Sequence, residues 1–60
     1  MITTQKDLRR QFWLDFPELE RRPGSQNQQV TDTRVAWCDY VEAMRRGGWI
    51  SEQLAERATL

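Results

Sequence analysis

The sequence predicts an all-α fold in which three helices form one small domain over residues 1–60. One observation is a strong apolar stripe at helical spacing in residues 31–46. Another is a narrower stripe of the same period near the N-terminus. The glycines and prolines stand between these stretches rather than inside them. We therefore expect an antiparallel helical hairpin followed by a short C-terminal helix.

The central helix is predicted over Thr31–Arg46. Thr31 is the expected N-cap, since its hydroxyl can accept an unpaired backbone N–H of the first turn. Arg45 and Arg46 complement the negative end of the helix dipole, and Gly47 is expected in the left-handed cap conformation. The apolar side of this helix comprises Ala36, Trp37, Tyr40, Val41, Ala43 and Met44.

The first helix is predicted over Thr4–Phe16, with Thr4 as its N-cap. Its apolar stripe is made by Leu8, Phe12 and Phe16. Trp13 flanks this stripe, whereas Leu14 lies nearly opposite it. Arg9 precedes Trp13 by one turn, so a cation–π contact between them is expected if the indole is exposed.

The connection between these helices contains two turn signals. Pro17 disfavours helical geometry at Phe16 and predicts a break there. The polar stretch of about 22–29 is expected to be a flexible loop with nothing to bury. Within it, Pro23 and Gly24 are typical of a type II turn.

A third helix is predicted over about Glu52–Ala58, after the glycine pair. Ser51 is its expected N-cap. A helix this short is marginal alone, so it must dock on the others. Trp49 and Ile50 are the expected tethers.

Composition limits what holds this domain together. A chain of 60 residues has one modest core and marginal stability. One cysteine and no histidine exclude an intramolecular disulfide and the common zinc patterns. We expect neither metal nor cofactor. The remaining ways to gain stability are large aromatic side chains and self-association, so a homodimer is possible.

Charge and hydropathy narrow the class of protein. Nine basic and nine acidic residues balance, which argues against a general polyanion binder and against a DNA mimic. The N-terminus lacks the apolar segment of an export signal, and no long apolar run follows. We expect a cytoplasmic protein with no membrane partner.

Catalytic equipment is sparse, and no enzymatic activity is expected. No histidine can act as a base near neutral pH, and no glycine-rich phosphate loop follows a strand. Glu52 and Glu56 share a helix face, but such pairs usually form a solvated face. Cys38 has no partner cysteine or base and is interpreted as a passive residue.

Three arginine pairs raise the possibility of nucleic-acid binding. They are Arg9–Arg10, Arg21–Arg22 and Arg45–Arg46. Antiparallel packing of the first two helices would let some of them converge and grip phosphates. The turn at Gly47 is typical of a helix-turn-helix, but the following segment S-E-Q-L-A-E-R carries two glutamates that would repel DNA. A small nucleic-acid-binding regulator is therefore the alternative function.

The tryptophans favour protein binding instead. Trp37 is assigned to the core, whereas Trp13 and Trp49 are less easily hidden. Exposed Trp beside Arg is the usual composition of a binding hot spot. The predicted anchors are Trp13, Trp49 and Leu14, and the predicted polar rim is Arg9, Arg10, Arg45 and Arg46. We interpret the chain as a non-enzymatic protein-binding module.

Three stretches carry a resemblance to a known group of proteins. They are T-Q-K-D-L-R-R-Q-F-W (Thr4–Trp13), T-D-T-R-V-A-W-C-D-Y-V (Thr31–Val41) and I-S-E-Q-L-A-E-R-A-T-L (Ile50–Leu60). They resemble short, mostly uncharacterised proteins of tailed-phage and prophage genomes. The resemblance implies a phage accessory protein that binds and blocks a host protein, for example a CRISPR effector. Other members of this group act in transcription or DNA metabolism.

Overall fold

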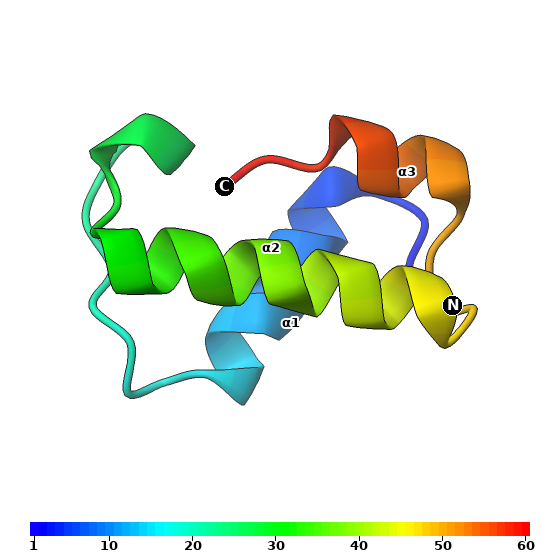
Figure 1. The fold of residues 1–60 in the computed structure, drawn as a ribbon, viewed down its shortest axis with the longest axis horizontal. Coiled ribbons are helices and arrows are strands. Elements are labelled where there is room, and N and C mark those ends of the chain that lie inside the picture. The colour runs from blue at the N-terminus through cyan, green and yellow to red at the C-terminus, as the bar shows by residue number, and fades with distance from the viewer.

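The computed structural model describes residues 1–60 and contains only helices and their connections. The helices are α1 (Gln5–Asp15), the short 3-10 helix η1 (Gln26–Gln28), α2 (Thr31–Arg46) and α3 (Glu52–Arg57) (Figure 1). The predicted all-α, three-helix fold is confirmed. None of these helices is both long and apolar enough to cross a membrane.

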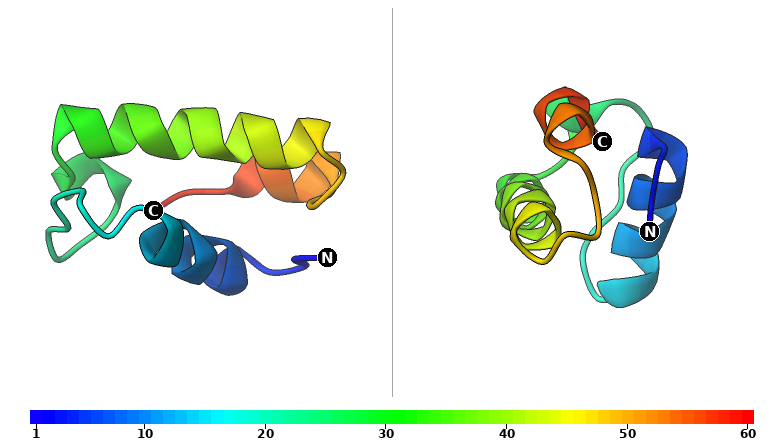
Figure 2. Two further views of the ribbon diagram at one scale, coloured as in Figure 1. Left: turned by 90° about the horizontal axis from the view of Figure 1, so that it is seen from below. Right: turned by 90° about the vertical axis from the view of Figure 1, so that its right-hand side faces the viewer.

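The helix α2 lies along the longest dimension of the molecule, and the other helices pack against it (Figure 1). α1 runs back in the opposite sense but crosses α2 steeply, as the two views of Figure 2 show. The two helices of the predicted hairpin therefore cross at a steep angle and do not lie side by side along their length. The connection over residues 16–30 is long, and only short connections force consecutive helices to run closely alongside each other.

The core is a small cluster of buried apolar side chains from all three helices. It contains Leu8, Phe12, Trp37, Ile50 and Leu54. Phe12 packs edge-to-face on Trp37 with ring centroids 5.2 Å apart, a favourable arrangement of aromatic quadrupoles. Phe16, Val41 and Met44, which the stripes predicted as core, pack around this cluster but stay partly exposed.

Two of the predicted N-caps are confirmed and one is wrong. The Thr4 hydroxyl accepts the N–H of Asp7 at 3.1 Å. The Ser51 hydroxyl accepts the N–H of Leu54 at the same distance. Thr31 is not a cap, because α2 begins at Thr31 itself after Val30.

The C-terminal cap of α2 differs from the prediction by one residue. Gly47 is right-handed with φ −76°, and Gly48 takes the left-handed conformation with φ +77°. The N–H of Trp49 donates to the Met44 carbonyl at 3.0 Å, and that of Gly48 to the Arg45 carbonyl at 3.1 Å. These two bonds form a Schellman motif, in which the residue after the cap must be left-handed.

Two buried polar side chains hold the connection between α1 and α2. Thr33 of α2 is fully buried, and its hydroxyl donates to the Glu20 carbonyl at 2.8 Å. Gln29 is also buried, and its amide accepts from the Arg22 N–H at 2.9 Å and donates to the Arg22 carbonyl at 2.7 Å. The expectation that this polar stretch has nothing to bury was wrong for Gln29.

Tyr40 gives a direct test of how α1 and α2 meet. Its hydroxyl donates to the Asp15 carboxylate at 3.1 Å. Burial, then the hydrogen bond to Asp15 and its negative charge, raise the pKa of Tyr40 to about 12. The tyrosinate is therefore disfavoured in the folded state. The contribution of the protonated Tyr40 hydroxyl to folding stability is fully present below about pH 10. It is lost as the pH rises towards 12, because the unfolded chain then ionises more readily than the folded one.

We expect ultraviolet absorbance to show that Tyr40 ionises with a midpoint near pH 12. In the variant Asp15→Asn this midpoint should fall but stay above pH 10. The residual shift is expected because burial is the larger cause. Tyr40 is the chain's one tyrosine, so the signal reports a single group. An unchanged midpoint in Asp15→Asn would contradict this contact between the helices.

Candidate functional site

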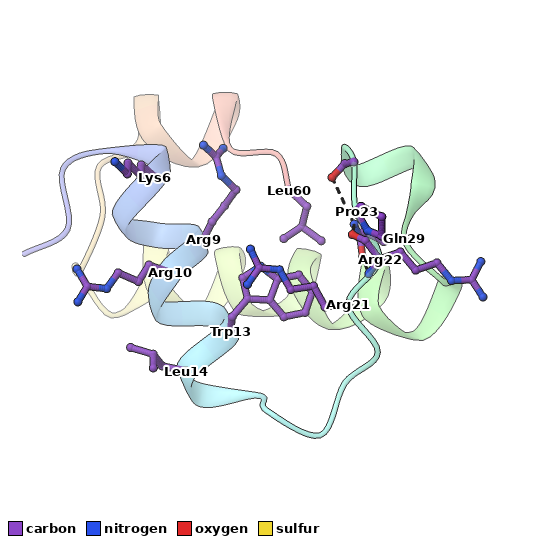
Figure 3. Close-up of a pocket in the computed structure, with 11 residues that line it drawn as sticks. Lys6, Arg9, Arg10, Trp13, Leu14, Arg21, Arg22, Pro23, Gln29 and Leu60 are labelled. Atoms are coloured by element: carbon purple, nitrogen blue, oxygen red, sulfur yellow. Dashed lines mark hydrogen bonds between the residues drawn. The ribbon is translucent and has the colours of Figure 1, made fainter.

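A groove of about 890 Å³ lies between α1 and the chain segment that follows it (Figure 3). It is lined by Lys6, Arg9, Arg10, Trp13, Leu14, Arg21, Arg22, Pro23, Gly24, Gln29 and Leu60. Five of the chain's nine basic residues are in this lining, and none of its nine acidic residues is. A chain of zero net charge thus concentrates positive charge on one surface, which we call the basic groove.

One wall of the basic groove is a face of α1. Its side chains are Lys6, Arg9, Arg10, Trp13 and Leu14. These positions are spaced by three and four residues, and such residues lie on the same side of an α-helix. The opposite face of α1 carries Leu8 and Phe12 into the core. Burial of that face therefore fixes the direction in which the basic face points.

The other wall of the basic groove is residues 21–24, which have no helix to orient them. Instead, the paired hydrogen bonds between Gln29 and the backbone of Arg22 hold this segment. Gly24 has φ +110°, the positive value expected at the turn after Pro23. The wall is therefore positioned by hydrogen bonds from the Gln29 side chain to its backbone.

Trp13 lies at the centre of the groove, half-buried against the core. Its ring meets Phe12 with centroids 4.9 Å apart. The Arg21 guanidinium lies 4.9 Å from the Trp13 centroid, as a cation–π pair. The predicted partner, Arg9, turns away instead and donates to the Thr59 carbonyl at 2.9 Å. That prediction was wrong because Arg9 meets the C-terminal segment, which the sequence pattern did not place.

Most of the positive charge in the groove is not neutralised within the molecule. Arg22 pairs with Glu20 at 2.5 Å, and both side chains are more than half exposed. No hydrogen bond or ion pair engages Lys6, Arg10 or Arg21. These three cations are free to meet an external anion.

The basic side chains are spread along the groove rather than gathered at one point. In Figure 3, Arg10 and Arg22 point outward at opposite ends, and Arg21 lies between them across Trp13. A single small anion would need several donors converging on one position. This arrangement suits an elongated anionic chain instead.

The structure brings together four of the seven site residues predicted from the sequence. Trp13, Leu14, Arg9 and Arg10 all line the basic groove. Leu14 is 64% exposed, the highest value for a large apolar side chain after Met1. Two of the three arginine pairs, Arg9–Arg10 and Arg21–Arg22, converge on this surface.

The other three predicted site residues lie elsewhere, at the C-terminal end of α2. Trp49 is 58% exposed there. Arg45 and Arg46 both bind Glu42, at 2.5 and 3.0 Å. The hydrogen bond from Arg45 is the main cause that holds the pKa of Glu42 below its ordinary value. These two arginines are thus already engaged within their own helix.

Several residues of the basic groove were not predicted as site residues from the sequence. Lys6 could have been found, because it precedes Arg9 and Arg10 by three and four residues on one helix face. The Arg21–Arg22 pair was noticed, but nothing in the pattern placed it opposite α1. Gln29 and Leu60 gave no signal, since both reach the groove through irregular chain.

No group of three or more potential metal-ligating side chains lies together in the structure. No family model matches the chain, and no curated protein and no solved structure matches it either. The chemistry of the groove therefore carries the functional argument.

Proposed function

We propose that this protein is a non-enzymatic binding module that docks an acidic segment of a partner protein in the basic groove. The observation that carries the proposal is the strip of five basic side chains, without an acidic neighbour in the lining, around a half-buried tryptophan. Opposite charges across an interface steer association and fix the register of the partner. Trp and Arg are also the residue types that dominate binding energy at protein interfaces.

A protein partner is favoured over a nucleic acid by the state of Trp13. Single-stranded nucleic acids stack their bases on open aromatic faces, but here Arg21 lies over the ring. The exposed Leu14 at the rim offers apolar contact area, which a phosphate backbone does not use. The zero net charge also deprives the chain of a long-range field that would attract polyanions in general.

The resemblance to phage proteins supplies the biological setting of the proposal. In that setting the partner is a host protein in the cytoplasm of the infected cell. Docking would cover an acidic segment that the host protein needs for its own contacts, and would thereby inhibit it. A defence protein is one such target.

The test is titration of the protein with a labelled peptide of glutamate and glutamine, about 16 residues long, at low and moderate salt. Such a peptide would extend about 24 Å as a helix, comparable with the 27 Å length of the molecule. We expect binding that weakens steeply as salt rises, because ions screen exposed charges. A matched lysine–glutamine peptide is the control and should not bind. Absence of glutamate-peptide binding at low salt would reject the proposal.

A nucleic-acid-binding regulator remains the second candidate, because two arginine pairs do converge on one surface. The same titration with duplex and single-stranded DNA decides between the two functions. If phosphates are the ligand, DNA should bind more tightly than the acidic peptide and with a steep salt slope. No DNA binding at low salt would remove this candidate.

A further inference from the structure

We infer that the partner's docking segment is amphipathic, with an apolar side chain that seats on Leu14 beside acidic side chains that meet Arg10. This inference rests on the proposed function and specifies the kind of acidic segment that the site takes. It follows from the way in which the basic groove continues into a second, differently lined surface.

The second surface is a hollow of about 370 Å³ next to the basic groove. It is lined by Met1, Ile2, Asp7, Arg10, Gln11 and Leu14. Arg10 and Leu14 line both hollows, so together they form the ridge between them. In Figure 3 their side chains point to the same side of α1, away from Arg22. A ligand that lies along the groove therefore reaches both side chains.

Leu14 and Arg10 are one helical turn apart, which sets the spacing of the groups that would meet them. Residues four apart on a helix have their Cβ atoms about 5–6 Å apart. An acidic helix that carries a leucine one turn from a glutamate presents the complementary pair at the same spacing. Burial of the exposed Leu14 against that leucine adds apolar stabilisation that an all-polar acidic chain cannot obtain.

The charges also fix the direction in which the ligand lies along the ridge. Asp7 lines the second hollow but not the basic groove. It would repel an acidic side chain placed over the second hollow. The acidic part of the ligand therefore lies towards Arg21, and its apolar part lies over Leu14 and Ile2. This arrangement discriminates against a chain that is acidic along its whole length.

The inference is tested with two peptides of equal length and equal negative charge. One contains only glutamate and glutamine, and the other replaces glutamines on one helical face near one end by leucine. We expect the leucine-bearing peptide to bind about tenfold more tightly. In Leu14→Ser most of this advantage should disappear. Val35→Ser is the matched control, because Val35 is also more than half exposed but lies outside both hollows.

The outcomes distinguish failure of this inference alone from failure of the proposed function. If both peptides bind native protein equally, the apolar anchor is wrong while the acidic-segment proposal stands. The apolar anchor is also wrong if Leu14→Ser keeps the full advantage, or if Val35→Ser loses as much. If the glutamate–glutamine peptide does not bind at low salt, both proposals fail. If single-stranded DNA of similar length binds more tightly than both peptides, the groove belongs to nucleic acid and both proposals are overturned.

Discussion

Replacing Trp37 by alanine is expected to leave the chain largely unfolded. Trp37 is 1% exposed and lies in the middle of the core, where its ring meets Phe12. Truncation of a buried Trp to Ala typically costs about 3–5 kcal/mol. A single core in a domain of this size rarely supplies more than about 3–5 kcal/mol in total. The loss is therefore as large as the stability that the fold has available.

The measurement is the far-ultraviolet circular dichroism of native and variant protein, with urea titration where a transition exists. Trp49→Ala is the matched control, because it deletes the same side chain from a position that is 58% exposed. We expect that variant to keep its helical signal and to lose at most about 1 kcal/mol, as is usual for surface positions. Equal losses in both variants would show that the assigned core is wrong.

The helices were predictable because their signals are local. α2 has the bounds that its apolar period predicted, Thr31–Arg46. The caps at Thr4 and Ser51 also depend only on residues within one turn. Gly47 and Gly48 are adjacent, and choosing between them requires the hydrogen bonds of the last turn, which the sequence does not display.

What the sequence did not reveal depends on contacts between distant residues. The steep crossing of α1 over α2 depends on contacts between the helices, such as that of Phe12 with Trp37, and a stripe of apolar residues does not fix that angle. The burial of Gln29 follows from its bonds to the Arg22 backbone, seven residues earlier. Polar residues in a loop are ordinarily exposed, so their pattern predicts the opposite.

The part of the candidate site on α1 could be predicted because its signal is local, whereas the rest depends on contacts between distant residues. Arg9, Arg10, Trp13 and Leu14 lie on one helix, so their shared face could be worked out from spacing. Trp49, Arg45 and Arg46 were grouped with them on residue type alone. Glu42, one turn before that arginine pair, was the local signal that these two cations have a partner already.

Reversing the charge of two unpaired groove cations, in Arg10→Glu/Arg21→Glu, is expected to weaken binding of the acidic peptide at least about 100-fold. Each reversal replaces an attraction by a repulsion, and like-charge juxtaposition at an interface costs several kcal/mol. A loss of about 2.7 kcal/mol already corresponds to a factor of about 100 in the dissociation constant. Neither side chain takes part in an ion pair within the protein. The variant loses the cation–π contact of Arg21 with Trp13, worth about 0.5–1 kcal/mol at an exposed site, so the fold should be largely retained.

The decisive control is Arg34→Glu/Arg57→Glu, which has the same net charge but leaves the groove untouched. Arg34 and Arg57 likewise take part in no ion pair. If the groove is the binding site, this variant should lose only the small, long-range part of the attraction, which added salt removes. Equal weakening in both variants would mean that the peptide senses the overall charge of the molecule. The dissociation constants, measured at matched ionic strength with circular dichroism as a check on folding, separate a local site from a diffuse field.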